Sequence, residues 1–128
     1  MIDFSPSPEQ KEWVAVAQRF ATEVVIPAAE RADRVPAPDQ AFDWNVVREA
    51  SKRGLRTLSV PRAFGGGGAD VLTLAMVGEQ IAYGDLGLAV AFDQSWKIMT
   101  AIVQLANDEQ RKRWIPRVVD DPEFLLGV

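Results

Sequence analysis

The stretch from Leu86 to Leu105 is apolar almost all the way round when it is drawn as a helix, and most of its polar residues gather at positions 93–97. A helix that is apolar on every side has to be surrounded by protein or by lipid. Its longest uninterrupted apolar run, residues 86–92, is far shorter than the ~20 residues that a bilayer-spanning helix needs. The sequence therefore predicts a central helix inside a helical domain, and no membrane span.

Helix-start signals mark the remaining helices. Ser7 can cap a helix, and it is followed by Pro8 and Gln10 in the pattern of a capping box. Asn107 and Gln110 repeat that pattern later in the chain. These signals and the Pro and Gly residues between them predict a helix from Pro8 that Pro27 bends or ends, a short helix after Asp43, a helix from Asp70 to about Tyr83, the central helix, and a helix after Asn107 limited by Pro116 and Pro122.

The apolar residues of two helices predict which sides are buried. In the short helix, Trp44, Val47 and Ala50 fall on one side and are expected to face inward. Gly54 follows at the position where a left-handed C-terminal cap belongs. The helix from Asp70 carries apolar residues on more than one side, which predicts burial on several sides.

These elements predict an all-α fold, an orthogonal or up-down bundle of about five helices, for residues 1–121. Residues 122–128 differ in kind, because a short apolar run from Phe124 to Val128 follows two aspartates and a proline. Such a run is typical of a strand. A strand needs a neighbour to pair with, so we interpret residues 122–128 as the start of a following β-domain whose continuation is absent.

Composition excludes several classes of function. The 128 residues contain no Cys and no His, which removes disulfides, Cys/His zinc sites and Ser-His-Asp or Cys-His catalysis from this chain. A formal net charge of −4 is opposite to what a general nucleic-acid binder carries. The amino terminus lacks the basic start and apolar run of a secretory signal, so the cytoplasm is the expected compartment.

The four consecutive glycines at 65–68 allow two interpretations. Glycine-rich loops can hold phosphate groups, but no Gly-Lys-Ser/Thr follows here and no strong strand precedes. We therefore interpret residues 65–68 as a flexible structural loop.

One side of the central helix is a candidate substrate site. Phe92, Trp96 and Met99 recur at steps of 4 and 3, and Asp93 lies beside them with Lys97 four residues further on. Apolar stripes of this kind are usually core, and Asp93 with Lys97 can equally be a solvated ion pair. If that side faces an absent second domain, these residues line a ligand pocket instead.

Several short motifs occur in a fixed order along the chain. They are Pro8-Glu9-Gln10, Arg19-Phe20-Ala21 with Pro27-Ala28-Ala29, Gly54-Leu55 with Val60-Pro61 and Phe64-Gly65-Gly66, the run from Gly78 to Asp85, and the run from Asp108 to Pro116. As an ordered set they resemble the amino-terminal helical domain of the acyl-CoA dehydrogenases, almost from end to end. The four glycines and the pair Trp96-Lys97 depart from the family pattern.

The resemblance implies a flavoenzyme of three parts: this helical domain, a middle β-domain and a carboxy-terminal helical domain, with FAD held among the latter two. Such enzymes act in fatty acid β-oxidation. They remove a proton from the carbon α to an acyl-CoA thioester and pass a hydride from the β carbon to flavin. The catalytic glutamate and the flavin-binding motifs lie beyond Val128 in this family. The resemblance thus implies no catalytic residue, no bound FAD and no turnover for this chain alone.

Three functional hypotheses follow. In the first, the chain is the helical domain of an acyl-CoA dehydrogenase that covers the flavin and walls the acyl pocket, with Phe92, Asp93, Trp96 and Met99 as pocket candidates, in an oligomeric enzyme. In the second, it is a non-catalytic helical subunit or interaction module that docks onto a separate flavin-binding chain. In the third, the same scaffold serves a flavin oxidase or monooxygenase.

Overall fold

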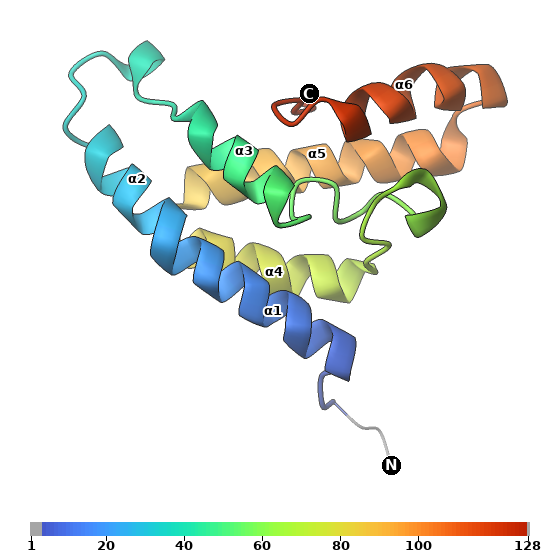
Figure 1. The fold of residues 1–128 in the computed structure, drawn as a ribbon, viewed down its shortest axis with the longest axis horizontal. Coiled ribbons are helices and arrows are strands. Elements are labelled where there is room, and N and C mark those ends of the chain that lie inside the picture. The colour runs from blue at the N-terminus through green and yellow to red at the C-terminus, as the bar shows by residue number, and fades with distance from the viewer. Residues whose placement is uncertain (1–3, 128) are drawn as a thin grey trace.

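The computed structural model describes residues 4–127, and these form an all-α fold (Figure 1). Counting the uninterrupted α1–η1–α2 rod once, the described helices longer than one turn are that rod, α3, α4, α5 and α6, five in all. The predicted helical bundle is confirmed. The elements are α1 (Pro8–Phe20), the π-helical turn η1 (Ala21–Val25), α2 (Ile26–Ala32), the 3-10 turn η2 (Pro38–Gln40), α3 (Trp44–Lys52), the 3-10 turn η3 (Arg62–Phe64), α4 (Val71–Gly84), α5 (Leu86–Leu105) and α6 (Asp108–Asp120).

The first helix does not end at Pro27, and it continues through η1 into α2 as one long rod (Figure 1). Proline has no backbone N–H, so an ordinary helix loses a hydrogen bond at this point. Here the backbone N–H of Ile26 bonds to the carbonyl of Ala21, five residues back, rather than to a carbonyl four residues back. The wider π-helical turn before the proline lets the chain remain helical.

Capping decides where the helices begin and end. Ser7 and Asn107 form the expected capping boxes with Gln10 and Gln110. Gly54 has a φ of 75°, which confirms the left-handed end of α3. α6 continues past Pro116 to Asp120 and ends before Pro122, the second of the two prolines expected to limit its length.

α4 and α5 form a helical hairpin with its turn at Asp85, and α6 returns along α5 (Figure 1). The side chain of Arg111 joins the last two helices. Its Nε donates to the carbonyl oxygen of Val103 at 3.0 Å, and its Nη1 lies 3.1 Å from Oδ1 of Asp108. A cation is thereby placed against the carbonyl end of α5, where the helix dipole favours positive charge.

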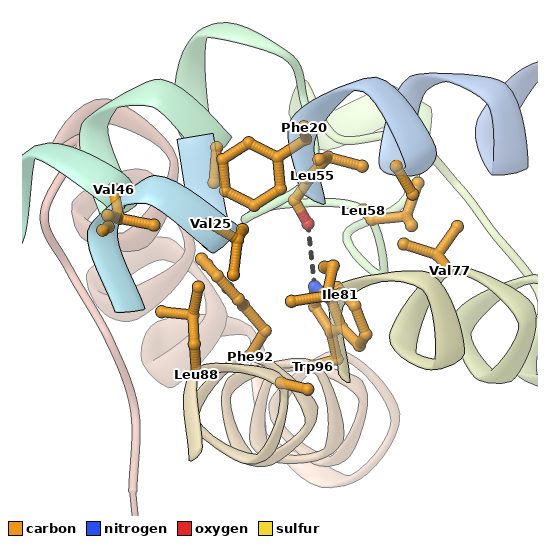
Figure 2. Packing of buried hydrophobic residues seen from close by; sticks show 14 residues of the cluster. Phe20, Val25, Val46, Leu55, Leu58, Val77, Ile81, Leu88, Phe92 and Trp96 are labelled. Carbon is orange, nitrogen blue, oxygen red and sulfur yellow. Dashed lines mark hydrogen bonds between the residues drawn. The ribbon is translucent and has the colours of Figure 1, made fainter. Parts of the chain in front are cut away.

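Buried apolar side chains form two clusters. The larger one joins the α1–α2 rod, α3, α4 and the first half of α5, and Figure 2 shows Phe20, Leu55, Ile81, Phe92 and Trp96 meeting within it. The smaller one lies between the second half of α5 and α6; its buried members are Val60, Met99, Ile115 and Val118.

Two expectations about burial are wrong. Trp44 is not directed into the core: it is 46% exposed and packs edge-to-face on Phe42, with ring centroids 4.9 Å apart. Val46 takes its place among the buried residues of α3. α4 is not buried on several sides within this chain either, since Leu72 is 59% exposed and Tyr83 is 83% exposed. The spacing of apolar residues shows which sides of a helix are apolar. It does not show whether those sides are buried by the same chain or by another domain or subunit.

No strand forms between Phe124 and Gly127, and Val128 lies outside the described residues. The side chains of residues 124–126 nevertheless alternate between the two buried clusters. Leu125 packs against the larger cluster, whereas Phe124 and Leu126 pack against the smaller one. In the described residues, the apolar run that suggested a strand therefore packs on the two buried clusters and does not pair with another strand.

Within residues 4–127, no helix has the length and apolar character needed to cross a membrane.

Candidate functional site

The candidate residues of α5 divide between its two sides. Phe92, Trp96 and Met99 point into the domain and are buried. Asp93 is partly exposed and makes an ion pair with the exposed Lys97. The structure therefore brings the first three together within the protein interior and places Asp93 at the edge of the exposed side of α5.

Trp96 is held at the centre of the larger cluster. Its side chain packs on Phe92, with ring centroids 6.2 Å apart and planes inclined by 24°. Its indole Nε1 donates a hydrogen bond of 2.9 Å to the carbonyl oxygen of Leu55 (Figure 2). A buried indole with a satisfied N–H is the arrangement of a core residue. Because Trp96 is 2% exposed, a ligand could reach it only if the elements packed around it moved apart.

The outward side of α5 carries a second row of residues. Leu86, Val90, Asp93, Lys97 and Ala101 follow one another at steps of 4, 3, 4 and 4, which places them on one side of a helix. Leu86 is 69% exposed, and Val90 is exposed as well. We call these five residues the outer row of α5. It is apolar at its N-terminal end and carries an ion pair near its middle.

The glycine loop offers no phosphate-binding donors. The backbone N–H groups of Gly65, Gly66, Gly67 and Gly68 donate to carbonyl oxygens of residues 57–62 in the preceding turn. Gly66 and Gly67 also pack against backbone, since a Cβ on Gly66 would lie 2.1 Å from the carbonyl oxygen of Val60. The loop is therefore a closed, tightly packed turn in which glycine is required for close approach.

The N-termini of five helices are capped by side chains. Each of the helices α1, α3, α4, α5 and α6 begins with a side chain that accepts a backbone N–H of its own first turn; these caps are Ser7, Asp43, Asp70, Asp85 and Asn107. Dinucleotide cofactors such as FAD need free donors of this kind for their pyrophosphate. In each of these five helices, one such donor is already bonded to the cap side chain. Among the described residues, no cluster of three or more metal-binding side chains is present.

The sequence interpretation missed two buried polar residues, Arg56 and Ser95. Arg56 is 4% exposed, and its guanidinium donates to the carbonyl oxygens of Val118 and Phe124 at 2.6 and 3.0 Å. Burial lowers the pKa of Arg56, and the negative charge of Asp121 acts in the opposite direction. A lone charge in the apolar stretch after Gly54 was the available sequence signal.

A cleft of about 390 Å³ lies between α2, α3 and the start of α5. Its walls include the small side chains of Ala28, Ala29 and Ala32. None of Phe92, Asp93, Trp96 and Met99 lines it.

The comparison with known families decides the relationship. The family profile described as "Acyl-CoA dehydrogenase, N-terminal domain" matches residues 7–121, nearly the whole chain. The chain belongs to the acyl-CoA dehydrogenase family. Its helices are those of the amino-terminal domain of that family, in agreement with the ordered motifs in the sequence.

Individual relatives carry the same family name. The chain is 27% identical over 121 residues to a probable medium-chain specific acyl-CoA dehydrogenase 2, mitochondrial, of Caenorhabditis briggsae, and the alignment covers 94% of the chain. It is 26% identical over 111 residues to an acyl-CoA dehydrogenase of Bacillus subtilis, covering 86% of the chain. These alignments take in only 29% and 28% of the two relatives. The chain thus spans less than a third of the length of the acyl-CoA dehydrogenases that it resembles.

Proposed function

We propose that the chain is the helical domain of an FAD-dependent enzyme that introduces an α,β double bond into an acyl-CoA thioester. Other parts of the enzyme, or a partner subunit, hold the flavin and supply the catalytic base. The domain covers one side of the flavin and walls the acyl pocket, and it has no activity by itself. The observation that carries this proposal is the family match over residues 7–121.

The uncovered apolar side chains support a role in a larger assembly. Leu72 and Tyr83 on α4, and Leu86 and Val90 on α5, are exposed although they are large and apolar. Exposed apolar groups in such number on two adjoining helices favour cover by another domain or chain. In the proposed enzyme, the flavin-binding and carboxy-terminal parts provide that cover.

The burial of Phe92, Trp96 and Met99 refines which residues meet the acyl chain. These three support the wall from behind, because their side chains are already surrounded by the domain's own core. The outer row of α5 is available to a neighbouring part, and Asp93 belongs to it. We assign the acyl-facing role to this row, with Asp93 as the one candidate that stays in direct reach of substrate. A cytoplasmic location also remains part of the proposal.

Expression of the complete reading frame that contains this chain tests the proposal. The complete protein should carry flavin absorbance and should dehydrogenate acyl-CoA thioesters when an artificial electron acceptor is supplied. The isolated 128-residue chain should be colourless after gel filtration and should show no turnover. Flavin that stays with the isolated chain would contradict the assignment of the cofactor to other parts.

Co-purification separates this proposal from the non-catalytic subunit. A stable yellow complex with a second polypeptide would show that the flavin-binding part is a separate chain. A complete protein that consumes O₂ during turnover without any added acceptor would instead favour an oxidase or monooxygenase on the same scaffold.

A further inference from the structure

Residues 122–127, which we call the strap, are held against the helices by buried polar side chains. Among the described residues, those that are both buried and polar or charged are Arg56, Thr73 and Ser95. Thr73 belongs to the cap of α4, where it bonds to Asp70. Arg56 and Ser95 both bond to the strap. Burying a polar side chain costs free energy unless it is hydrogen-bonded, and both of these buried side chains form hydrogen bonds with this one short segment.

Ser95 bonds to the strap in both directions. Its hydroxyl donates to the carbonyl oxygen of Leu126 at 3.1 Å and accepts from the backbone N–H of the same residue at 2.9 Å. A neighbouring strand would offer the same donor and acceptor to an extended residue. One side chain of α5 therefore takes the place of a strand partner at this position.

Arg56 holds the strap together with α6. Its Nη1 reaches both the carbonyl oxygen of Val118 in α6 and that of Phe124 in the strap, and its Nε donates to the hydroxyl of Ser51 at 2.6 Å. That hydroxyl lies 2.6 Å from the carbonyl oxygen of Pro122, to which it donates. The planar guanidinium thus joins α3, α6 and the strap at one point, a geometry that lysine cannot reproduce.

Side-chain packing secures the strap from both sides. Leu125 lies against the larger apolar cluster, and Phe124 and Leu126 lie against the smaller one. Glu123 adds an ion pair with Arg48 of α3. Every strap residue from Pro122 to Leu126 therefore has a contact with a helix or a buried cluster, which is unlike a flexible interdomain linker.

We propose that Ser95 and Arg56 are positioning residues that lock the strap onto α5 and α3, and so fix the direction in which the chain leaves the domain relative to the outer row of α5. Two relatives are more than three times as long as the segment that aligns with this chain, so in the proposed enzyme the strap leads from this domain to a following part. The inference rests on the proposed function in one respect: the part reached through the strap is taken to be the flavin-binding part. A strap that is fixed on the helices would keep the outer row of α5 at a constant distance and orientation relative to the flavin.

Distance measurements between spin labels test this directly. The chain has no cysteine, so Ala101→Cys on the outer row and Gly127→Cys at the end of the strap can be labelled without side reactions. A Cβ at position 127 meets no atom within 4 Å, so the label there should leave the strap undisturbed. Pulsed electron paramagnetic resonance should give a narrow distance distribution. Ser95→Ala and Arg56→Lys should broaden it at temperatures where circular dichroism shows the variants to be folded.

Hydrogen exchange gives a second readout at a single group. The amide of Leu126 should exchange about tenfold faster in Ser95→Ala, as expected when one net hydrogen bond is lost. Ser95→Thr, which keeps the hydroxyl, should restore both the narrow distribution and the slow exchange.

Thr100→Ala is the matched control, since it removes another hydroxyl from α5 that bonds only within the helix, to the carbonyl of Trp96. It should leave the distance distribution and the exchange of Leu126 unchanged. A broad distribution in the labelled chain that keeps Ser95 and Arg56, or a narrow one in both Ser95→Ala and Arg56→Lys, would overturn the proposal. Because these experiments measure neither flavin nor turnover, their failure is separate from failure of the proposed function.

Discussion

The indole nitrogen of Trp96 donates a hydrogen bond of 2.9 Å to the backbone carbonyl oxygen of Leu55. Trp96 is 2% exposed, and Leu55 is fully buried. The bond ties the middle of α5 to the turn that follows α3. It satisfies a carbonyl that water cannot reach, so it fixes the position of the indole as well as that of the loop.

Trp96→Phe should therefore destabilise the domain by roughly 2–4 kcal/mol, since it opens a cavity and leaves the Leu55 carbonyl with only the longer hydrogen bond from the Leu58 N–H, at 3.4 Å. Urea denaturation followed by circular dichroism measures this free energy of unfolding. Trp44→Phe is the control, because Trp44 is half exposed, and its change should stay within about 0.5 kcal/mol. Equal effects at the two positions would show that Trp96 is not a core residue.

Two glycine substitutions should change stability in opposite directions. A Cβ at Gly66 would lie 2.3 Å from Cβ of Val60 as well as close to its backbone, so Gly66→Ala should cost roughly 3 kcal/mol or more. Gly78 lies inside α4, and a Cβ there would meet only Trp96 at an ordinary 3.7 Å. Gly78→Ala should stabilise by about 0.5–1 kcal/mol through its helix propensity.

Thermal melts of the two variants check this pair. A normal melting temperature for Gly66→Ala would mean that the loop is flexible, as the sequence alone had suggested, and can shift to accept a methyl group. A large loss in Gly78→Ala would mean that α4 approaches α5 more closely than the structure indicates.

The contribution of Asp70 to the free energy of unfolding should disappear in acid. Hydrogen bonds from the side chain and backbone of Thr73 lower the pKa of Asp70 below its usual range. A carboxylate whose pKa is lower in the folded state than in the unfolded state stabilises at pH values above the unfolded pKa, and this contribution fades as pH falls through the folded pKa. The loss therefore begins below about pH 4.

Asp70→Asn keeps a good helix cap but cannot titrate. The urea midpoint of this variant should fall less between pH 7 and pH 3 than that of the unsubstituted domain. An identical fall in both proteins would mean that Asp70 contributes nothing to the acid dependence.

The caps that begin helices could be predicted well from the local sequence. The burial of apolar side chains by distant parts of the structure could not. Ser7, Asp70 and Asn107 cap their helices because a short side chain can satisfy the first-turn donors within a few residues of sequence. The exposure of Leu72 could not be predicted in this way, since it depends on what lies outside the domain. The sequence did not reveal that the helix continues past Pro27, because the π-helical turn that precedes this proline has no sequence signal of its own.

For the candidate site too, local patterns could be predicted from the sequence and contacts between distant residues could not. Periodicity correctly grouped Phe92, Trp96 and Met99 on one side of α5, and burial now assigns that side to the core. The polar contacts of Ser95 and Arg56 with the strap join positions 31 and 68 residues apart in sequence. Contacts of that separation depend on the packed fold, so neither helix periodicity nor capping rules reveal them.

In the complete flavoenzyme, substitutions on the two sides of α5 should affect the preference for acyl-chain length differently. Val90 lies on the exposed outer row, so Val90→Trp should shorten or narrow the proposed acyl pocket, and activity should shift toward acyl-CoA thioesters with shorter chains. Trp96→Phe should lower stability and leave the ratio of kcat/KM values across the chain-length series unchanged, because the ring lies behind the wall. The measurement is kcat/KM for thioesters of increasing length, with flavin content and melting temperature recorded for each variant. A well-folded Trp96→Phe enzyme with altered preference, together with an unaltered Val90→Trp enzyme, would place substrate on the inner side of α5. It would also require this helix to separate from the Leu55 loop in the complete protein.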